Sequence, residues 1–126
     1  MGYFCFNYMA VVVQKIKKSY AQMDMAIAYY STISVLNHLA LTNRELQLLA
    51  FTAIRGSITN PAAREDFCQT YKTSQATINN LISKLRKLKL FVKEQNKIKV
   101  HPAIALDFSQ PVILQITLLK SGENGQ

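Results

Sequence analysis

Residues 60–101 read NPAAREDFCQTYKTSQATINNLISKLRKLKLFVKEQNKIKVH, and this stretch decides the fold. A helix is expected to begin here, because Asn60 is a good N-cap and Pro61 occupies the first helical position, where a missing N–H costs nothing. The inward side of this helix is expected to carry Phe67, Cys68 and Tyr71.

A short polar turn through Lys72 and Thr73 separates that helix from the next one. Ser74 is suited to cap the second helix, which is predicted to run to about Leu88. Apolar residues recur along it at helical spacing and define one buried stripe: Ile78, Leu81, Ile82, Leu85 and Leu88.

The end of the stretch alternates apolar and basic residues, which is typical of strands rather than of a helix. Two strands are predicted, at residues 90–94 and 97–101. Gln95 and Asn96 join them, and asparagine tolerates the positive φ that a two-residue hairpin turn requires. The order helix, turn, helix, hairpin is therefore predicted from this stretch alone.

The segment before it, LTNRELQLLAFTAIRG at residues 41–56, carries the start and stop signals of another helix. Thr42 and Glu45 have the spacing of a capping box, and Leu41 and Leu46 have that of a hydrophobic staple. Gly56 is placed to end the helix in a left-handed conformation. The buried stripe is expected at Leu46, Leu49, Ala53 and Ile54.

The two ends of the chain are predicted to add one helix and two strands. Residues 11–18, VVVQKIKK, and 111–120, PVILQITLLK, are rich in β-branched residues and are expected to be strands that pair within or between subunits. A helix between residues 19 and 40 is expected to have two apolar stripes, one with Met25, Tyr29, Ile33 and Leu36 and the other with Tyr20, Met23, Ile27 and Tyr30. Either the core or a second subunit then covers it. The predicted fold class is α+β, mainly α.

The composition fits one small folded domain with an anionic partner. The 126 residues are 49% hydrophobic, and 15 Lys and Arg against 7 Asp and Glu give a net charge of +8. Such an excess favours nucleic acid, a membrane surface or an acidic protein, of which nucleic acid is the commonest. The first residues lack the pattern of a secretory signal, and the uncharged run 25–41 is too short and polar to span a bilayer. We therefore expect a cytoplasmic protein without a membrane partner, beginning at Met1 or at Met9.

No pattern of catalytic or ligand-binding residues is present in the sequence. His38 and His101 lie far apart, and Cys5 and Cys68 fit neither a disulfide framework nor a metal site. The carboxylates form no recognisable acid/base pair, and the few glycines provide no phosphate-binding loop. We expect no enzymatic activity, no metal or other cofactor and no small-molecule ligand.

Residues 41–104, read as helices followed by a basic hairpin, resemble the winged helix-turn-helix superfamily, which includes MarR-like regulators and many phage DNA-binding proteins. The resemblance rests on REDFCQTYKTSQATINNLISKLRKLKLFVKEQNKIKV, in which Lys72 stands where many such turns carry glycine and Thr73 where an apolar residue is usual. We divide the chain accordingly. Residues 1–40 serve packing or self-association, 41–104 form the winged domain, 105–120 hold the C-terminal strand, and 121–126 are a disordered tail.

The resemblance implies that the helix beginning after Ser74 enters the major groove of duplex DNA while the hairpin contacts the backbone. Asparagine and glutamine can pair bidentately with adenine, and the side chains near the bases would be Gln75, Thr77, Asn79, Asn80, Ser83 and Lys84. Phosphates would be contacted by Ser74, Arg86, Lys87, Lys89, Lys93, Lys97 and Lys99. Between residues 84 and 99 the chain carries seven basic residues and one acid, Glu94.

Three roles are compatible with such a surface. The compact format and the phrase LTNRELQLLAFTAIRG resemble small phage-encoded proteins, including those of crAss-like phages, which would act as transcriptional or replication regulators. A second role is that of a terminase small subunit, which marks viral DNA for packaging and works as a ring. A third is a protein-interaction module that docks on a polymerase or virion component through its basic face. A homodimer or a higher homo-oligomer is expected, and an assembly larger than a dimer would favour packaging.

Overall fold

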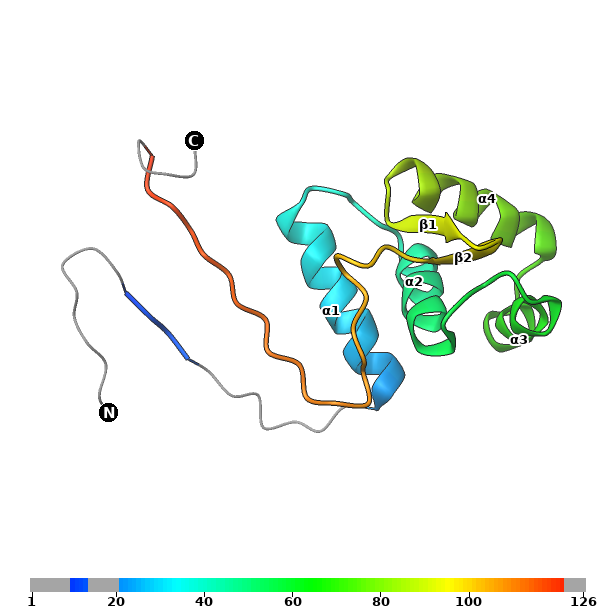
Figure 1. The fold of residues 1–126 in the computed structure, drawn as a ribbon, viewed down its shortest axis with the longest axis horizontal. Coiled ribbons are helices and arrows are strands. Elements are labelled where there is room, and N and C mark those ends of the chain that lie inside the picture. Colours follow the sequence, from blue (N-terminus) through cyan, green and yellow to red (C-terminus); the bar gives the residue numbers. More distant parts are fainter. Residues whose placement is uncertain (1–9, 14–20, 122–126) are drawn as a thin grey trace.

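The computed structural model describes residues 10–13 and 21–121. Within them the chain is α+β and mainly helical, with four helices and one two-stranded antiparallel sheet. The elements are α1 (Gln22–Leu36), α2 (Asn43–Arg55), α3 (Pro61–Tyr71), α4 (Gln75–Lys87), β1 (Phe91–Glu94) and β2 (Lys97–Val100), arranged as Figure 1 shows. The predicted order of helices and hairpin from residue 41 onward is confirmed, and it is compatible with a winged layout.

Helix α2 lies at the centre of the molecule and contacts α1, α3, α4 and β2. Leu48, Leu49 and Ala50 are completely or almost completely buried, and so is Thr52, one turn after Leu48. The predicted stripe is therefore too narrow: Leu46 and Leu49 are buried as expected, but neighbouring elements cover most of the helix. A helix surrounded in this way holds the other elements in place.

The predicted helix starts and stops are confirmed. The side chains of Thr42, Asn60 and Ser74 each accept a hydrogen bond from a backbone N–H in the first turn of the helix that follows. Gly56 ends α2 with φ of +94°, a conformation that a residue with a Cβ adopts only at a cost. Pro61 occupies the start of α3, as its fixed φ favours.

Three residues, 72–74, connect α3 to α4. Lys72 adopts the left-handed conformation that glycine usually supplies at such a position, with φ of 52°. The Thr73 N–H donates to the Cys68 carbonyl over 3.0 Å and so satisfies an end group of α3. The turn therefore has its left-handed residue even though Lys72 stands in place of the usual glycine.

The hairpin pairs Phe91 with Val100 and Glu94 with Lys97. Gln95 and Asn96, its two turn residues, both have positive φ, which matches the twist of the strands and confirms the predicted hairpin. On the other edge of β2, the Ile58 N–H donates to the Ile98 carbonyl over 3.0 Å, and the Ile98 N–H donates to Thr59 Oγ1 over 2.7 Å. The link between α2 and α3 therefore covers the middle of that edge.

Helix α1 packs on α2, and its buried residues are Ala26, Tyr30 and Ser34. Tyr30 belongs to one predicted stripe, whereas Ala26 and Ser34 belong to neither. Tyr29 and Tyr30 contact each other and Phe108, with ring centroids 5.0–5.7 Å apart, and burial raises the pKa of both phenols. The Tyr30 hydroxyl donates to the Ile104 carbonyl over 2.9 Å. These contacts attach the segment after the hairpin to α1. The prediction for Leu36 is wrong, since this residue is 43% exposed, and Tyr20 lies outside the described residues.

The strand predicted at residues 111–120 is not formed within the single chain. The segment is extended, but it pairs with no strand among the described residues. Residues 11–13 are likewise in no strand; positions 14–18 of that prediction, and 122–126 of the predicted tail, lie outside the described residues. The physical reason is the lack of a partner: β-propensity forms a strand only where another edge accepts its hydrogen bonds. The described part of the chain provides no pairing of the two ends.

Candidate nucleic-acid interface

Helix α4 is amphipathic, and its outward face is polar and free of acidic residues. Ile78, Ile82 and Leu85 are buried against the core. Because successive residues are about 100° apart around a helix, the positions most directly opposite this stripe are Ala76, Asn80, Ser83 and Lys87. All four are exposed, so the central predicted groove-facing positions are on the surface.

Asn79 lies on the flank of that face and is held by α3. Arg64 Nη1 donates to Asn79 Oδ1 over 2.7 Å, and Arg64 Nε donates to the Ile58 carbonyl over 2.9 Å. Asn79 Oδ1 therefore already accepts one hydrogen bond, which holds the carboxamide toward Arg64 and leaves one acceptor site and the NH₂ group for another partner. Bidentate pairing with adenine would compete with this orientation, so Asn79 is less well suited to it than a free carboxamide.

Asn80 and Gln75 differ from Asn79 in this respect. Both are exposed, and their side chains make no hydrogen bond among the described residues. Each carboxamide thus has its donor and its acceptor free. Of the two, Asn80 lies nearer the middle of the outward face, which makes it the better placed to meet a base edge.

Ser74 and Thr77 act within the protein at the start of α4. Ser74 Oγ accepts a hydrogen bond from the Thr77 N–H over 3.2 Å and lies 3.0 Å from Thr77 Oγ1. The two hydroxyls therefore serve the cap of the helix. Ser74 is exposed and Thr77 half-buried, so both stand beside the predicted interface.

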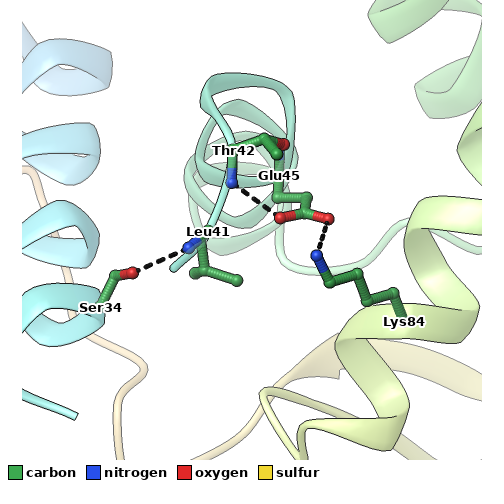
Figure 2. Close-up of polar contacts among 5 residues, drawn as sticks. All are labelled: Ser34, Leu41, Thr42, Glu45 and Lys84. Carbon is green, nitrogen blue, oxygen red and sulfur yellow. Dashed lines mark hydrogen bonds and ion pairs between the residues drawn. The ribbon is translucent and has the colours of Figure 1, made fainter. Parts of the chain in front are cut away.

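Lys84 points back to α2, as Figure 2 shows, and its Nζ lies 2.7 Å from Glu45 Oε2. The Glu45 side chain is 5% exposed, and its other oxygen accepts a hydrogen bond from the Thr42 N–H over 2.8 Å. Burial by itself would raise the pKa of the Glu45 carboxyl, but the hydrogen bonds from Lys84 and Thr42 outweigh it and hold the pKa below its ordinary value. Lys84 thus compensates a buried carboxylate, while its own side chain stays 47% exposed.

The other basic residues at the end of α4 are exposed. Arg86 and Lys87 occupy its last turn, where positive charge also interacts well with the helix dipole. Lys89 follows with φ of 63°, and the Leu90 N–H donates to the Leu85 carbonyl over 2.9 Å, which closes the helix end. No ion pair of these three side chains is found among the described residues.

The hairpin lysines do not share one face. Because side chains alternate along a strand, Lys97 and Lys99 lie on the outer face with Glu94, whereas Lys93 lies on the face of Phe91 and Ile98. Glu94 stands directly opposite Lys97 and offsets part of its charge. The lysines of the predicted wing therefore belong to two separate basic surfaces, one with Lys97 and Lys99 and the other with Lys93.

Lys97 and Lys99 line an open groove of about 790 Å³ between the hairpin and the link from α2 to α3. Arg55 also lines it, and so do the two turn residues of the hairpin, Gln95 and Asn96. Arg55 Nη1 is 2.7 Å from Asp66 Oδ2, an exposed ion pair that orients the guanidinium. The groove places three basic side chains around one concave surface.

Sequence reasoning missed Arg64 and Arg55. Both come from outside the basic stretch 84–99, and each contacts a residue that is distant in sequence. No spacing rule connects residues on α3 with residues on α4 in this way. The signal that was available is weaker: both are arginines at the polar side of a predicted helix.

Other classes of site have little support in the described residues. No group of three or more His, Cys, Asp or Glu side chains that could hold a metal ion occurs within 10–13 and 21–121. His101 Nδ1 accepts a hydrogen bond from the Ala103 N–H over 3.0 Å and so shapes the turn after the hairpin. None of the helices described is long and apolar enough to cross a membrane.

No protein-family model, no curated protein and no solved structure matches the chain. A functional proposal for the chain therefore depends on the geometry of α4, the hairpin and their basic side chains. The strongest feature of that geometry is the outward face of α4, which carries the free carboxamide of Asn80 together with Ser83 and Lys87.

Proposed function

We propose that the chain binds duplex DNA through a winged helix-turn-helix unit in residues 41–104 and acts as a regulator of transcription or replication. In this proposal α4 enters the major groove, which is wide enough to admit one helix. Asn80, Gln75 and Ser83 meet base edges, and the basic side chains at the end of α4 contact phosphates. Lys84 and Asn79 take part indirectly, because they hold α2 and Arg64 in place.

The single observation that carries the proposal is the exposed face of α4. From Gln75 to Lys87 the helix contains no acidic residue, and its buried stripe leaves Asn80, Ser83 and Lys87 exposed on the opposite side. Base edges are read by hydrogen-bonding side chains, of which asparagine and glutamine suit adenine, and phosphates are held by lysine and arginine. Both kinds of group occur here on one rigid helix.

The hairpin gives the proposed complex a second contact. Lys97, Lys99 and Arg55 surround the groove beside β2, and this concave basic surface suits a phosphate of the DNA backbone. Lys93 is exposed on the other face of the hairpin. The two basic surfaces would contact different parts of the backbone.

The variant Asn80→Ala tests whether α4 reads bases. On a duplex selected from a random pool by the wild type, we expect Asn80→Ala to bind about 5–150-fold more weakly, because a bidentate contact is worth about 1–3 kcal/mol. On an unrelated duplex the two proteins should bind alike. Gln110→Ala, which removes an exposed carboxamide far along the chain, is the matched control. Fluorescence anisotropy at fixed salt measures the six affinities of the three proteins for the two duplexes, and an equal loss on both duplexes would contradict base reading.

The main rival role is docking on an acidic protein through the same basic residues. That role predicts that the charges of residues 86–99 matter for binding the partner while Asn80 does not. The variant Asn80→Ala therefore separates the two roles. Packaging of viral DNA, as by a terminase small subunit, uses the same DNA chemistry but requires a ring. The number of subunits in solution separates it from regulation.

A further inference from the structure

Arg64 is an arginine on α3 that uncharged groups hold in place beside α4. Its Nε donates to the Ile58 carbonyl over 2.9 Å, and its Nη1 donates to Asn79 Oδ1 over 2.7 Å. Figure 1 shows α3 next to α4, the two helices that the second of these hydrogen bonds connects. The guanidinium is therefore fixed to the link before α3 on one side and to α4 on the other.

The positive charge of Arg64 has no acidic partner within the part of the chain that the structure describes. The two acids that follow it on α3 have other partners: Asp66 pairs with Arg55 over 2.7 Å, and Glu65 accepts a hydrogen bond from Gln69 over 3.4 Å. A guanidinium has five N–H groups, and the two hydrogen bonds of Arg64 use two of them. Both N–H groups of Nη2 and one of Nη1 therefore remain for a negatively charged acceptor.

Asn79, which holds Arg64, lies on a flank of α4. Because successive residues are about 100° apart around a helix, Asn79 is about a quarter turn from the buried stripe. A helix with its side chains is about 10–12 Å across, and the major groove is about 12 Å wide. A helix that fills the groove meets base edges with its outward face and the sugar-phosphate walls with its flanks. The side chain that Asn79 holds is therefore expected beside a phosphate rather than beside a base.

Arg86 lies on the same flank of α4. It follows Asn79 by seven residues, which is close to two whole turns, so the two side chains lie on one side of the helix about 10 Å apart along its axis. Arg86 is exposed and belongs to the basic side chains proposed to contact phosphates. One wall of the groove would thus face a basic residue from α3 as well as one from α4.

We propose that Arg64 contacts a phosphate of the DNA backbone and that Asn79 is the positioning residue that holds its guanidinium. This role rests on the proposed binding of duplex DNA and extends the interface to α3. Both groups that fix Arg64 are uncharged, so the side chain is ordered without losing its charge and has less conformational freedom to lose on binding. A phosphate contact carries no sequence information, so Arg64 adds affinity rather than specificity.

The salt dependence of binding tests the contact. Arg64→Met removes the charge and the donors but keeps an unbranched side chain. We expect it to bind duplex DNA about tenfold more weakly at about 100 mM salt, equally on a selected and on an unrelated sequence. The slope of the logarithm of the binding constant against that of the salt concentration should become shallower by about 0.9. Fluorescence anisotropy measures both quantities, and circular dichroism verifies that the variant folds.

Arg44→Met is the matched control. Arg44 is half-buried like Arg64, and uncharged groups hold it too: its Nη1 donates to Gln47 Oε1 over 3.2 Å, and its guanidinium lies over the Tyr71 ring, 5.7 Å from the centroid. Tyr71 is the last residue of α3, about 10 Å along the helix axis from Arg64. Arg44→Met removes the same charge and should leave the affinity within about threefold and the slope within about 0.3.

A double-mutant cycle tests the role of Asn79. Asn79 is exposed, so Asn79→Ala leaves the core unchanged. We expect it to weaken binding about fivefold in the wild type but less than about twofold in Arg64→Met, because its effect passes through Arg64. An equal loss in both backgrounds, or a loss confined to one duplex, would overturn the positioning role. If Arg64→Met does not fold, Asn79→Ala alone decides, and unchanged affinity would overturn the proposal.

The failure of this contact is distinguishable from the failure of the proposed function. If the wild type binds duplex DNA while Arg64→Met keeps its affinity and its slope, the contact is wrong and DNA binding stands. The same holds if Arg44→Met loses as much affinity as Arg64→Met. No binding of the wild type at about 50 mM salt would contradict both.

Discussion

Reversal of two charges at the end of α4, in the variant Arg86→Glu/Lys87→Glu, is expected to lower the affinity for duplex DNA at least about hundredfold at about 100 mM salt. Both side chains are exposed and lie on or beside the outward face of the helix. Each lost phosphate contact weakens binding, and the introduced carboxylates add repulsion from the backbone. Fluorescence anisotropy with a labelled duplex measures the change.

A comparison of two single variants separates the effect of the α4 surface from the effect of net charge. The single variants Lys87→Glu and Lys120→Glu change the net charge equally, but Lys120 is an exposed residue far along the chain from α4. We expect Lys87→Glu to weaken binding several times more than Lys120→Glu. If the two were equivalent, net charge rather than the surface of α4 would explain the binding, and the proposed docking would be wrong.

Removing the partner of the buried Glu45 carboxylate, in Lys84→Met, is expected to destabilise the protein by about 1–3 kcal/mol. Glu45 would keep its hydrogen bond from Thr42 but would lose the ion pair at 2.7 Å that compensates its burial. Lys87→Met, on the exposed side of the same helix, should change the free energy of unfolding by less than about 0.5 kcal/mol. Urea denaturation followed by circular dichroism provides both values.

A double variant that combines Lys84→Met with Glu45→Gln tests whether the lost ion pair causes this destabilisation. Glutamine retains the capping-box hydrogen bond without the charge, so Lys84→Met should cost much less when Glu45→Gln is already present. A cost that stays the same in both backgrounds would show that the two side chains do not interact. A Lys84→Met variant with unchanged stability and weaker DNA binding would instead place Lys84 at the DNA.

The same pair makes stability depend on pH in a defined direction. The pKa of Glu45 is lowered in the folded protein, so its stabilising effect is present above the ordinary carboxyl pKa of about 4.3 and is lost as the pH falls through the lowered value. The stability difference between wild type and Glu45→Gln should therefore be full at neutral pH and shrink below about pH 4.

The local structure of residues 41–101 could be predicted from sequence because local signals decide it. Thr42 and Glu45 specify the start of α2, Ser74 specifies that of α4, and the alternation after residue 90 specifies the hairpin. Each of these signals acts between residues that are close in the chain, where capping and periodicity rules apply. The exposed position of Asn80 follows from the same periodicity.

The sequence could not reveal contacts between distant elements. Lys84 was expected at the groove, yet it compensates Glu45 on α2, and Asn79 is held by Arg64 on α3. Such pairings depend on how the helices pack, which no spacing rule contains. The strand expected at residues 111–120 failed for a related reason, since a strand requires a partner edge as well as a suitable sequence.

The most direct test of the central claim is the affinity of the wild type for a labelled duplex of about 20 base pairs, measured by anisotropy between about 50 and 200 mM salt. If the basic residues of α4 and the hairpin contact about five phosphates, the logarithm of the binding constant should fall with the logarithm of the salt concentration with a slope of about −4.5. No binding at about 50 mM salt, or an affinity that does not change with salt, would contradict the claim that this surface binds DNA.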